Sequence, residues 1–144
     1  MQNVRQILQK KGSQVYSIGP DETIYKALEI MAEKKLGALL VTENDKLCGI
    51  FSERDYARKV ILKGKASKNT LVKEIMTSDV LYIHPDCTVE ECMELMTEKY
   101  VRHLPVLEND NLVGVISIGD VVMADIAEKE YTIKQLENYI HGGR

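Results

Sequence analysis

Apolar residues recur along the chain with two different spacings, which predicts alternating helices and strands. Spacings of three and four positions predict an amphipathic helix, and they join Ile24, Ala27, Leu28, Met31 and Ala32. Continuous apolar stretches at 36–42 and 47–51 flank a polar turn at 43–46 and predict a hairpin. A short extended segment at 15–18 precedes the helix, and a further helix at 53–62 follows the hairpin. This part of the chain therefore predicts the order strand, helix, strand, strand, helix.

The same order is predicted a second time, because the chain repeats itself with an offset of 65 residues. Between positions 15–61 and 80–126, 19 of 47 aligned residues are identical. The second copy predicts strands at 80–83, 101–107 and 112–117 and helices that begin at Val89 and Gly119, the latter ending at Glu128. A period this long exceeds the roughly 20–50 residues of solenoid repeats. We therefore expect two similar units packed face to face, with two related clefts between them that bind ligands.

Four segments make up the predicted domain organisation. We expect an N-terminal helix at 1–14, a first repeat at 15–66, a second repeat at 67–128 and a C-terminal helix at 129–144. A polar linker ends near Thr70, and a helical turn at 71–76 is expected to lead into the second repeat. The fold class is α/β (α+β), with two β-α-β-β-α units related by pseudo-two-fold symmetry. The apolar stripes of the terminal helices are expected to cover this body or to meet a partner subunit.

Composition excludes several classes of protein. The chain has 144 residues, with 19 basic and 22 acidic side chains and a formal net charge of -3, so it has no general attraction to nucleic acid or anionic membranes. Three cysteines argue against a disulfide framework and for a reducing compartment, the cytoplasm. No apolar run approaches the ~18 residues that span a membrane, and residues 1–14 lack the apolar core of a secretion signal. The spacing of His84, Cys87 and Cys92 fits no usual zinc site, so no metal is expected.

Three motifs stand out within the repeated frame. They are I-x-P-D-x-T at 18–23 and 83–88, H-L-P-V at 103–106, and N-D-x-L-x-G-h-h-S-x-x-D at 44–55 and 109–120, where h is apolar. Together they resemble a tandem pair of CBS domains over about residues 12–130, and the segment 51–60 resembles small stand-alone CBS-pair proteins. The resemblance implies a regulatory module that binds AMP, ADP, ATP, S-adenosylmethionine or NAD in clefts between the repeats. It also implies a homodimer.

The S-x-x-D segments have chemistry that suits a nucleotide. One carboxylate can accept hydrogen bonds from both ribose hydroxyls, and the free N–H groups and dipole of a helix N-terminus favour a phosphate. Carried over residue by residue, the resemblance assigns the first cleft to Ser52, Arg54, Asp55, Arg58, Met76, Thr77, Val80, Arg102 and His103. It assigns the second cleft to Val15, Tyr16, Gly37, Ala38, Ser117 and Asp120. Because arginine forks bind phosphate in pairs of charged hydrogen bonds, the first cleft is expected to hold phosphate more tightly. The second is expected to take a nucleoside portion or to stay empty.

Other interpretations remain open from the residues alone. Asp55 and Asp120 are also well placed to cap helices, and both roles can hold together. Leu39-Leu40 stands where the family often has an apolar residue followed by proline, which bears on the backbone near Gly37 and Ala38. The leading hypothesis is a nucleotide sensor that signals to a separate regulated protein. The alternatives are an interaction scaffold with non-functional clefts and a nucleotide-hydrolysing enzyme. No G-x-S-x-G elbow, P-loop or H-E-x-x-H motif occurs, so neither catalysis nor a catalytic cofactor is expected.

Overall fold

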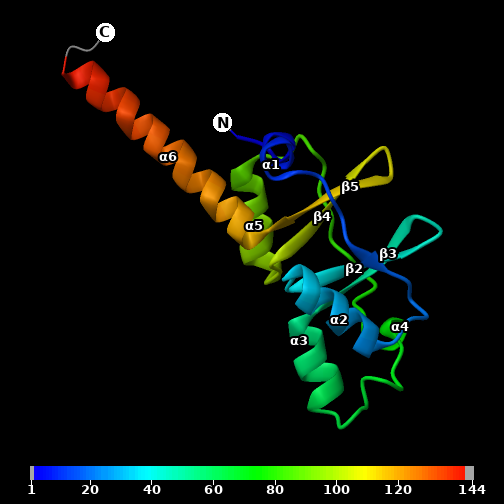
Figure 1. The fold of residues 1–144 in the computed structure, drawn as a ribbon. Helices are drawn as coiled ribbons and strands as arrows, with labels where there is room; N and C mark the ends of the chain where they lie inside the picture. The colour runs from blue at the N-terminus through cyan, green and yellow to red at the C-terminus, as the bar shows by residue number, and fades with distance from the viewer. Residues whose placement is uncertain (1, 142–144) are drawn as a thin grey trace. The chain divides into compact units, whose positions relative to one another are not determined.

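The computed structural model describes residues 2–141, and its mixture of helices and strands confirms the α+β class. The chain divides into two compact units. One consists of residues 15–81 and is called the Asp55 unit; the other joins residues 2–14 to residues 82–141 and is called the Asp120 unit. Figure 1 shows the elements of both.

The Asp55 unit follows the order predicted for the first repeat. It contains β1 (Ser17–Ile18), α2 (Ile24–Lys34), β2 (Ala38–Glu43), β3 (Lys46–Ser52), α3 (Glu53–Asp55), the π-helical η1 (Tyr56–Ile61) and α4 (Val72–Ile75). Its sheet has the order β1-β2-β3, with β1 parallel to β2 and β2 antiparallel to β3. Two details differ from expectation: the first strand covers only two residues, and the helix expected over 53–62 is π-helical after Asp55.

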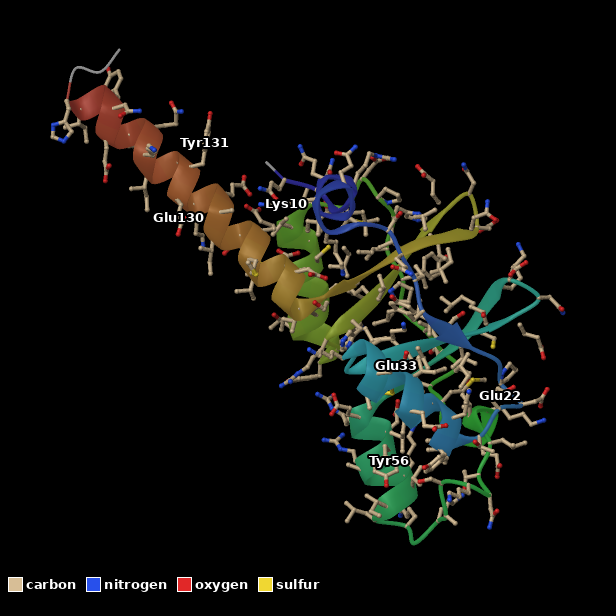
Figure 2. The ribbon with its side chains drawn as sticks, viewed as in Figure 1. Lys10, Glu22, Glu33, Tyr56, Glu130 and Tyr131 are labelled. Carbon is tan, nitrogen blue, oxygen red and sulfur yellow. The ribbon has the colours of Figure 1, made fainter. Side chains whose placement is uncertain are left out.

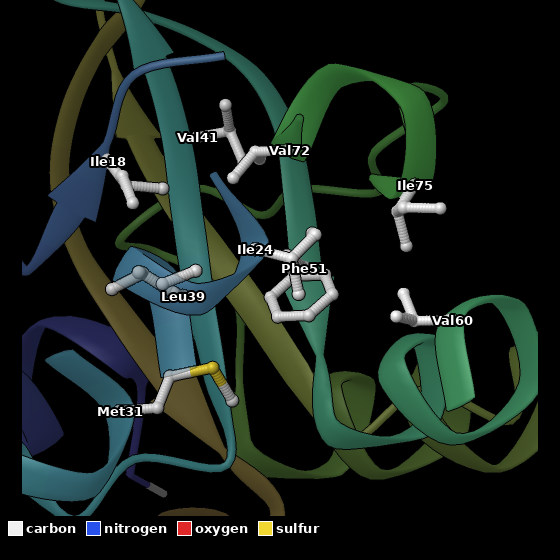
Figure 3. Close-up of a cluster of buried hydrophobic side chains, with 10 residues drawn as sticks. Ile18, Ile24, Met31, Leu39, Val41, Phe51, Val60, Val72 and Ile75 are labelled. Carbon is white, nitrogen blue, oxygen red and sulfur yellow. The ribbon is translucent and has the colours of Figure 1, made fainter. Parts of the chain in front are cut away.

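The core of the Asp55 unit lies between its sheet and its helices, as Figure 3 shows. The stripe predicted for α2 is buried at Ile24, Ala27 and Met31. Leu39 and Phe51 from the sheet are almost fully covered. Each large apolar side chain removed from water contributes roughly 1.5–3 kcal/mol. The single Phe and the aliphatic side chains therefore stabilise the frame that carries Asp55.

The Asp120 unit contains α1 (Val4–Lys11), α5 (Val89–Lys99), β4 (His103–Glu108), β5 (Asn111–Ser117) and α6 (Ile118–Ile140). β4 and β5 form an antiparallel pair. The strand expected at 80–83 is not formed; a single parallel bridge joins Ile83 to Val106. Since residues up to Leu81 belong to the Asp55 unit, only the end of this segment lies beside β4.

Both hairpins turn through two residues in the left-handed conformation. Asn44 and Asp45 have φ values of 52° and 65°, and Asn109 and Asp110 have 53° and 65°. Two consecutive positive φ values are typical of the two-residue turns that match the twist of paired strands, and Asn and Asp tolerate them well. The repeated N-D pair therefore places the bend of both hairpins, as the sequence predicted.

A single helix stands where the sequence predicted two. α6 runs without a break for 23 residues, from Ile118 to Ile140, although a boundary was expected after Glu128. No Gly or Pro interrupts the chain between Asp120 and Ile140, and an ion pair of 2.9 Å joins Lys129 to Asp125 one turn earlier. Good helix formers therefore continue the helix across the expected boundary. Residues 142–144 of the predicted C-terminal helix lie outside the described residues.

The short helix that precedes each repeat packs in the unit formed by the other repeat. Ahead of the first repeat, α1 belongs to the Asp120 unit: Val4 N donates to Cys87 O at 2.9 Å. Ahead of the second repeat, α4 belongs to the Asp55 unit: Val72 N donates to Glu22 O at 2.8 Å. The segment 67–81, which we expected to group with the second repeat, thus packs with the first.

Two glycines at equivalent positions make room for these exchanged segments. A Cβ atom on Gly114, in β5, would lie 2.6 Å from Cδ2 of Leu8 on α1. A Cβ atom on Gly49, in β3, would clash with the Met76 side chain and lie 3.2 Å from Thr77 O. The identical glycines in the two repeats therefore allow a neighbouring segment to approach the strand closely.

Candidate functional site

Both S-x-x-D segments form reciprocal capping boxes. At the start of α3, Asp55 N donates to Ser52 Oγ at 3.2 Å, and Ser52 N donates to Asp55 Oδ2 at 2.9 Å. At the start of α6, Ser117 and Asp120 make the same two bonds at the same distances. The capping interpretation is therefore confirmed at both sites. It places each carboxylate at a helix N-terminus, where backbone N–H groups and the helix dipole favour negative charge.

The second oxygen of Asp55 faces a small polar cluster within its unit. Lys59 Nζ lies 3.2 Å from Asp55 Oδ1 and donates to Ile75 O at 3.1 Å. Thr77 Oγ1 lies 3.5 Å from the same carboxylate oxygen. Thr77 is held in place by two backbone hydrogen bonds of 2.9 Å with Ile50. The Asp55 side chain is 13% exposed, so its acceptor is pre-positioned yet reachable.

Asp120 is engaged from a different direction. Lys11 Nζ, from the last turn of α1, lies 2.6 Å from Asp120 Oδ2 and also donates to Val115 O at 3.0 Å. Burial alone would raise the pKa of Asp120, but hydrogen bonds from Lys11 and Ser117, together with the charge of Lys11, leave this pKa below its ordinary value of 3.8. The carboxylate therefore stays ionised and charge-balanced.

Several other residues predicted for the clefts lie beside these carboxylates. In the Asp55 unit, Glu53 N donates to Gly37 O at 3.1 Å, and Ala38 pairs with Ser52 across β2 and β3. Met76 packs against Gly49, next to Thr77. These contacts bring Gly37 and Ala38 to the start of α3, whereas the sequence-based assignment grouped them with Asp120.

The remaining predicted residues are distributed over the two units. In the Asp120 unit, Ile118 N donates to Arg102 O at 2.8 Å, and His103 pairs with Ser117. In the Asp55 unit, the other members of the predicted set are the exposed Arg54 and Arg58 and the half-buried Val15, Tyr16 and Val80. Because Arg102 and His103 belong to a different unit from Asp55, their grouping with Asp55 stays a prediction.

The comparison with protein families decides the identity of the fold. Residues 4–62 and 72–127 both match the model of the CBS domain. The chain belongs to the CBS-domain family. The resemblance drawn from the repeated motifs is therefore confirmed, and each S-x-x-D segment lies inside one of the two matched CBS domains.

Relatives of this CBS-domain chain include proteins from plants and bacteria. The mitochondrial CBS domain-containing protein CBSX3 of Arabidopsis thaliana is 41% identical over 128 residues, which are 85% of this chain and 62% of CBSX3. The chain thus spans less than two thirds of that relative. A CBS-domain structure from Burkholderia ambifaria is 49% identical, with a TM-score of 0.85 over 88% of this chain and 95% of that one. The hexameric CBS-CP12 protein from bloom-forming cyanobacteria is 30% identical, with a TM-score of 0.76 over 84% of this chain and 66% of that one.

Sequence reasoning missed the two lysines of the CBS pair that contact the carboxylates. It assigned Lys59 to neither cleft, although a spacing of four from Asp55 signals a contact on one helix. Lys11 and Asp120 are separated by 109 positions, and no local pattern joins them. Only the packing of α1 in the Asp120 unit brings this pair together.

The structure also bears on metal binding, on membrane-spanning helices and on the thiols. Within residues 2–141, no three His, Cys, Asp or Glu side chains gather in a way that could hold a metal ion, and no helix is long and apolar enough to cross a membrane. Cys92 is buried on the apolar stripe of α5, as expected for a small core residue, and burial raises the pKa of its thiol to about 12. Burial also raises the pKa of Cys48, which is half-buried in β3.

Proposed function

We propose that this CBS-domain pair is a regulatory module that binds an adenine nucleotide, such as AMP, ADP, ATP or NAD, and signals the bound state to a partner protein. The observation that carries the proposal is the placement of the Asp55 carboxylate at the start of α3. It is largely covered, held by Ser52, and faces Thr77 and Lys59 through its other oxygen.

This arrangement provides separate partners for the sugar and the phosphate of a nucleotide. An ionised carboxylate offers about four lone-pair positions, so Asp55 can keep its cap and still accept bonds from a ribose diol. The same helical segment carries Arg54, Arg58 and Lys59, which supply positive charge. Guanidinium groups bind phosphate with paired charged hydrogen bonds. Arg102 and His103 remain proposed phosphate contacts, in accord with the sequence-based assignment.

Calorimetry with AMP, ATP and NAD tests this proposal, together with mass spectrometry of any small molecule that co-purifies. Asp55→Asn keeps a capping side chain but removes the charge. We expect it to weaken nucleotide binding by about tenfold to a hundredfold, the range for a lost charged hydrogen bond. Asp21→Asn is the matched control, because Asp21 is an exposed acid in the same unit that pairs with Lys73. Absence of heat or thermal shift with all three nucleotides would instead support the scaffold hypothesis.

The proposed role is binding without catalysis, in the cytoplasm. The named relatives are CBS-domain proteins, and one of them is mitochondrial by name, so the compartment is proposed from this chain's own cysteines. Incubation with ATP and Mg²⁺ distinguishes the enzyme alternative. We expect intact ATP after hours, and the appearance of ADP or AMP in proportion to protein would overturn the non-catalytic role.

We further propose that two copies of the chain pair through α6. Exposed apolar side chains follow one seam of this helix with alternating spacings of three and four: Val122, Ile126, Ile133, Leu136 and Ile140. Lys129 occupies the remaining position of the seam. Such a seven-residue pattern is the signature of a helix that packs against a similar helix, and one polar residue in the seam sets the register. Assembly also occurs in a relative, the hexameric CBS-CP12 protein.

Analytical ultracentrifugation tests the pairing. We expect a dimer for the unmodified chain and a monomer for the double variant Ile133→Glu and Leu136→Glu. Gln135→Glu is the control, since it adds charge at an exposed neighbouring position outside the seam. If the double variant sediments with the mass of the unmodified chain, the pairing through α6 is overturned. The proposal of nucleotide binding does not depend on this result.

A further inference from the structure

Lys11 joins three elements of the Asp120 unit through one ammonium group. It projects from the last turn of α1 and contacts Val115 O in β5 and Asp120 Oδ2 at the start of α6. The side chains of Lys11 and Asp120 are 35% and 23% exposed, so the pair is partly covered yet open to solvent. An ammonium group has three N–H donors. The acceptors found among residues 2–141 take two of these donors, which leaves one for a ligand.

The equivalent position in the Asp55 unit is filled by neutral groups. Ile50 aligns with Val115 in the repeat, and its carbonyl accepts from the backbone N–H of Thr77 at 2.9 Å. The Thr77 hydroxyl then lies 3.5 Å from Asp55. In the Asp120 unit one ammonium therefore contacts both the strand carbonyl and the carboxylate. In the Asp55 unit the amide and hydroxyl of Thr77 take these two places, and the ammonium of Lys59 reaches Asp55 separately, from its own helical segment.

The surroundings of Lys11 allow a ligand to reach it. Lys11 and Asp120 both line a groove of about 440 Å³ between α1 and α6. Figure 2 labels Lys10 on α1 and Glu130 on α6, which line the two sides of this groove. A cavity of this size falls within the range of small-molecule sites. The ion pair thus lies at an accessible wall and not in the interior of the unit.

We infer that Lys11 determines ligand choice at the Asp120 site, so that this site selects an anionic adenine nucleotide over the uncharged nucleoside. The inference rests on the proposed function, in which the aspartate of an S-x-x-D segment accepts hydrogen bonds from the ribose. Lys11 balances the charge of Asp120, so an incoming phosphate is not repelled by that carboxylate, and its third N–H can bond to the phosphate. This reverses the sequence-based expectation that the second cleft takes a nucleoside portion or stays empty.

Titration calorimetry with AMP and adenosine tests the inference in an Asp55→Asn background, which weakens the other site. In this background, Lys11→Met should weaken AMP binding by about tenfold to a hundredfold, as expected for loss of one charged hydrogen bond. Adenosine binding should stay unchanged or become tighter, because Asp120 is released for the ribose. Lys11→Arg keeps the charge and should restore the preference for AMP.

Lys10→Met is the matched control, because Lys10 is the neighbouring lysine on α1 and lines the same groove, whereas the Asp120 ion pair is made by Lys11. It should leave the ratio of AMP to adenosine affinity unchanged. If Lys11→Met weakens the binding of AMP and adenosine equally, or changes neither, the ratio of the two affinities is unchanged and the inference is overturned. Equal weakening would show that Lys11 has a structural role. Loss of all AMP binding in the Asp55→Asn background also overturns it, while leaving the proposed function intact. No AMP binding by the unmodified chain would defeat the proposed function itself.

Discussion

Gly114→Ala tests whether the close approach of α1 to β5 is required by the fold. The added Cβ would lie 2.6 Å and 2.9 Å from the two methyl carbons of Leu8 and 3.3 Å from its Cγ. Leu8 is 9% exposed and Gly114 is buried, so the leucine side chain has little room to move away. Overpacking of this kind typically costs about 1–3 kcal/mol.

A smaller effect acts in the opposite direction. Gly114 does not have a positive φ, so alanine suits its backbone and removes roughly 0.5–1 kcal/mol of the entropy disadvantage of glycine in a strand. The expected net loss is therefore about 0–2.5 kcal/mol of the free energy of unfolding, with a central value of about 1 kcal/mol, from the overpacking and entropy terms together. Urea unfolding followed by circular dichroism measures this loss.

A double-mutant cycle with Leu8→Ala makes the test specific. Leu8→Ala alone should cost about 2–5 kcal/mol by leaving a cavity. In the double variant the new alanine methyl occupies part of that cavity, so the combined loss should be smaller than the sum. Gly119→Ala is the control, because its Cβ would meet only Ser117 Oγ at an ordinary 3.6 Å. A Gly114→Ala protein more stable than the unmodified chain, or strictly additive losses in the double variant, would refute the close-packing argument.

Three further predictions concern local features of the two units. Lys35→Gly should raise the free energy of unfolding by about 0.5–1 kcal/mol, because Lys35 ends α2 with a φ of 58° that glycine adopts without strain; a loss of stability in thermal unfolding would contradict this. Because the folded pKa of Asp120 is lowered, its contribution to stability is complete above the ordinary value of 3.8 and is lost as pH falls through the folded value. Urea unfolding at a series of acidic pH values measures this effect. The free energy of unfolding should fall less steeply with decreasing pH in Lys11→Met than in the unmodified chain, and identical pH dependence would refute the linkage. Cys92, with its thiol pKa raised to about 12, should resist thiol reagents at pH 8 until the protein unfolds, and prompt labelling of Cys92 in the native protein would show that the site opens.

The sequence predicted the elements well where local chemistry decides them. The stripe of α2, the N-D turns of both hairpins and the S-x-x-D caps all appear as expected, because each depends on residues within a few positions of one another. Local patterns failed where the choice depended on distant partners. The strand expected at 80–83 is reduced to one bridge. The break expected after Glu128 is absent from α6 for a local reason, because no Gly or Pro interrupts the helix there.

The candidate sites show the same division. The two aspartates were identified from a repeated motif, and Thr77 was correctly placed beside Asp55. The partner of Asp120 was not identified, since α1 precedes the first repeat but packs in the unit of the second. The two carboxylate environments therefore differ in the segment that packs beside each strand, with Lys11 reaching Asp120 and Thr77 reaching Asp55, and in the local partner Lys59 of Asp55.

The amino-acid sequence by itself determined that this chain is a duplicated CBS fold with a capped aspartate at the start of one helix in each copy. Hydrophobic periodicity, turn residues and capping are short-range effects, so they can be recognised in a linear sequence. Only the tertiary structure decided that α1 and α4 exchange places between the repeats, and that Gly49 and Gly114 admit them. That exchange brings Lys11 to Asp120, and it brings Thr77 to Asp55, which also pairs locally with Lys59. Contacts between distant segments depend on packing that no local pattern encodes.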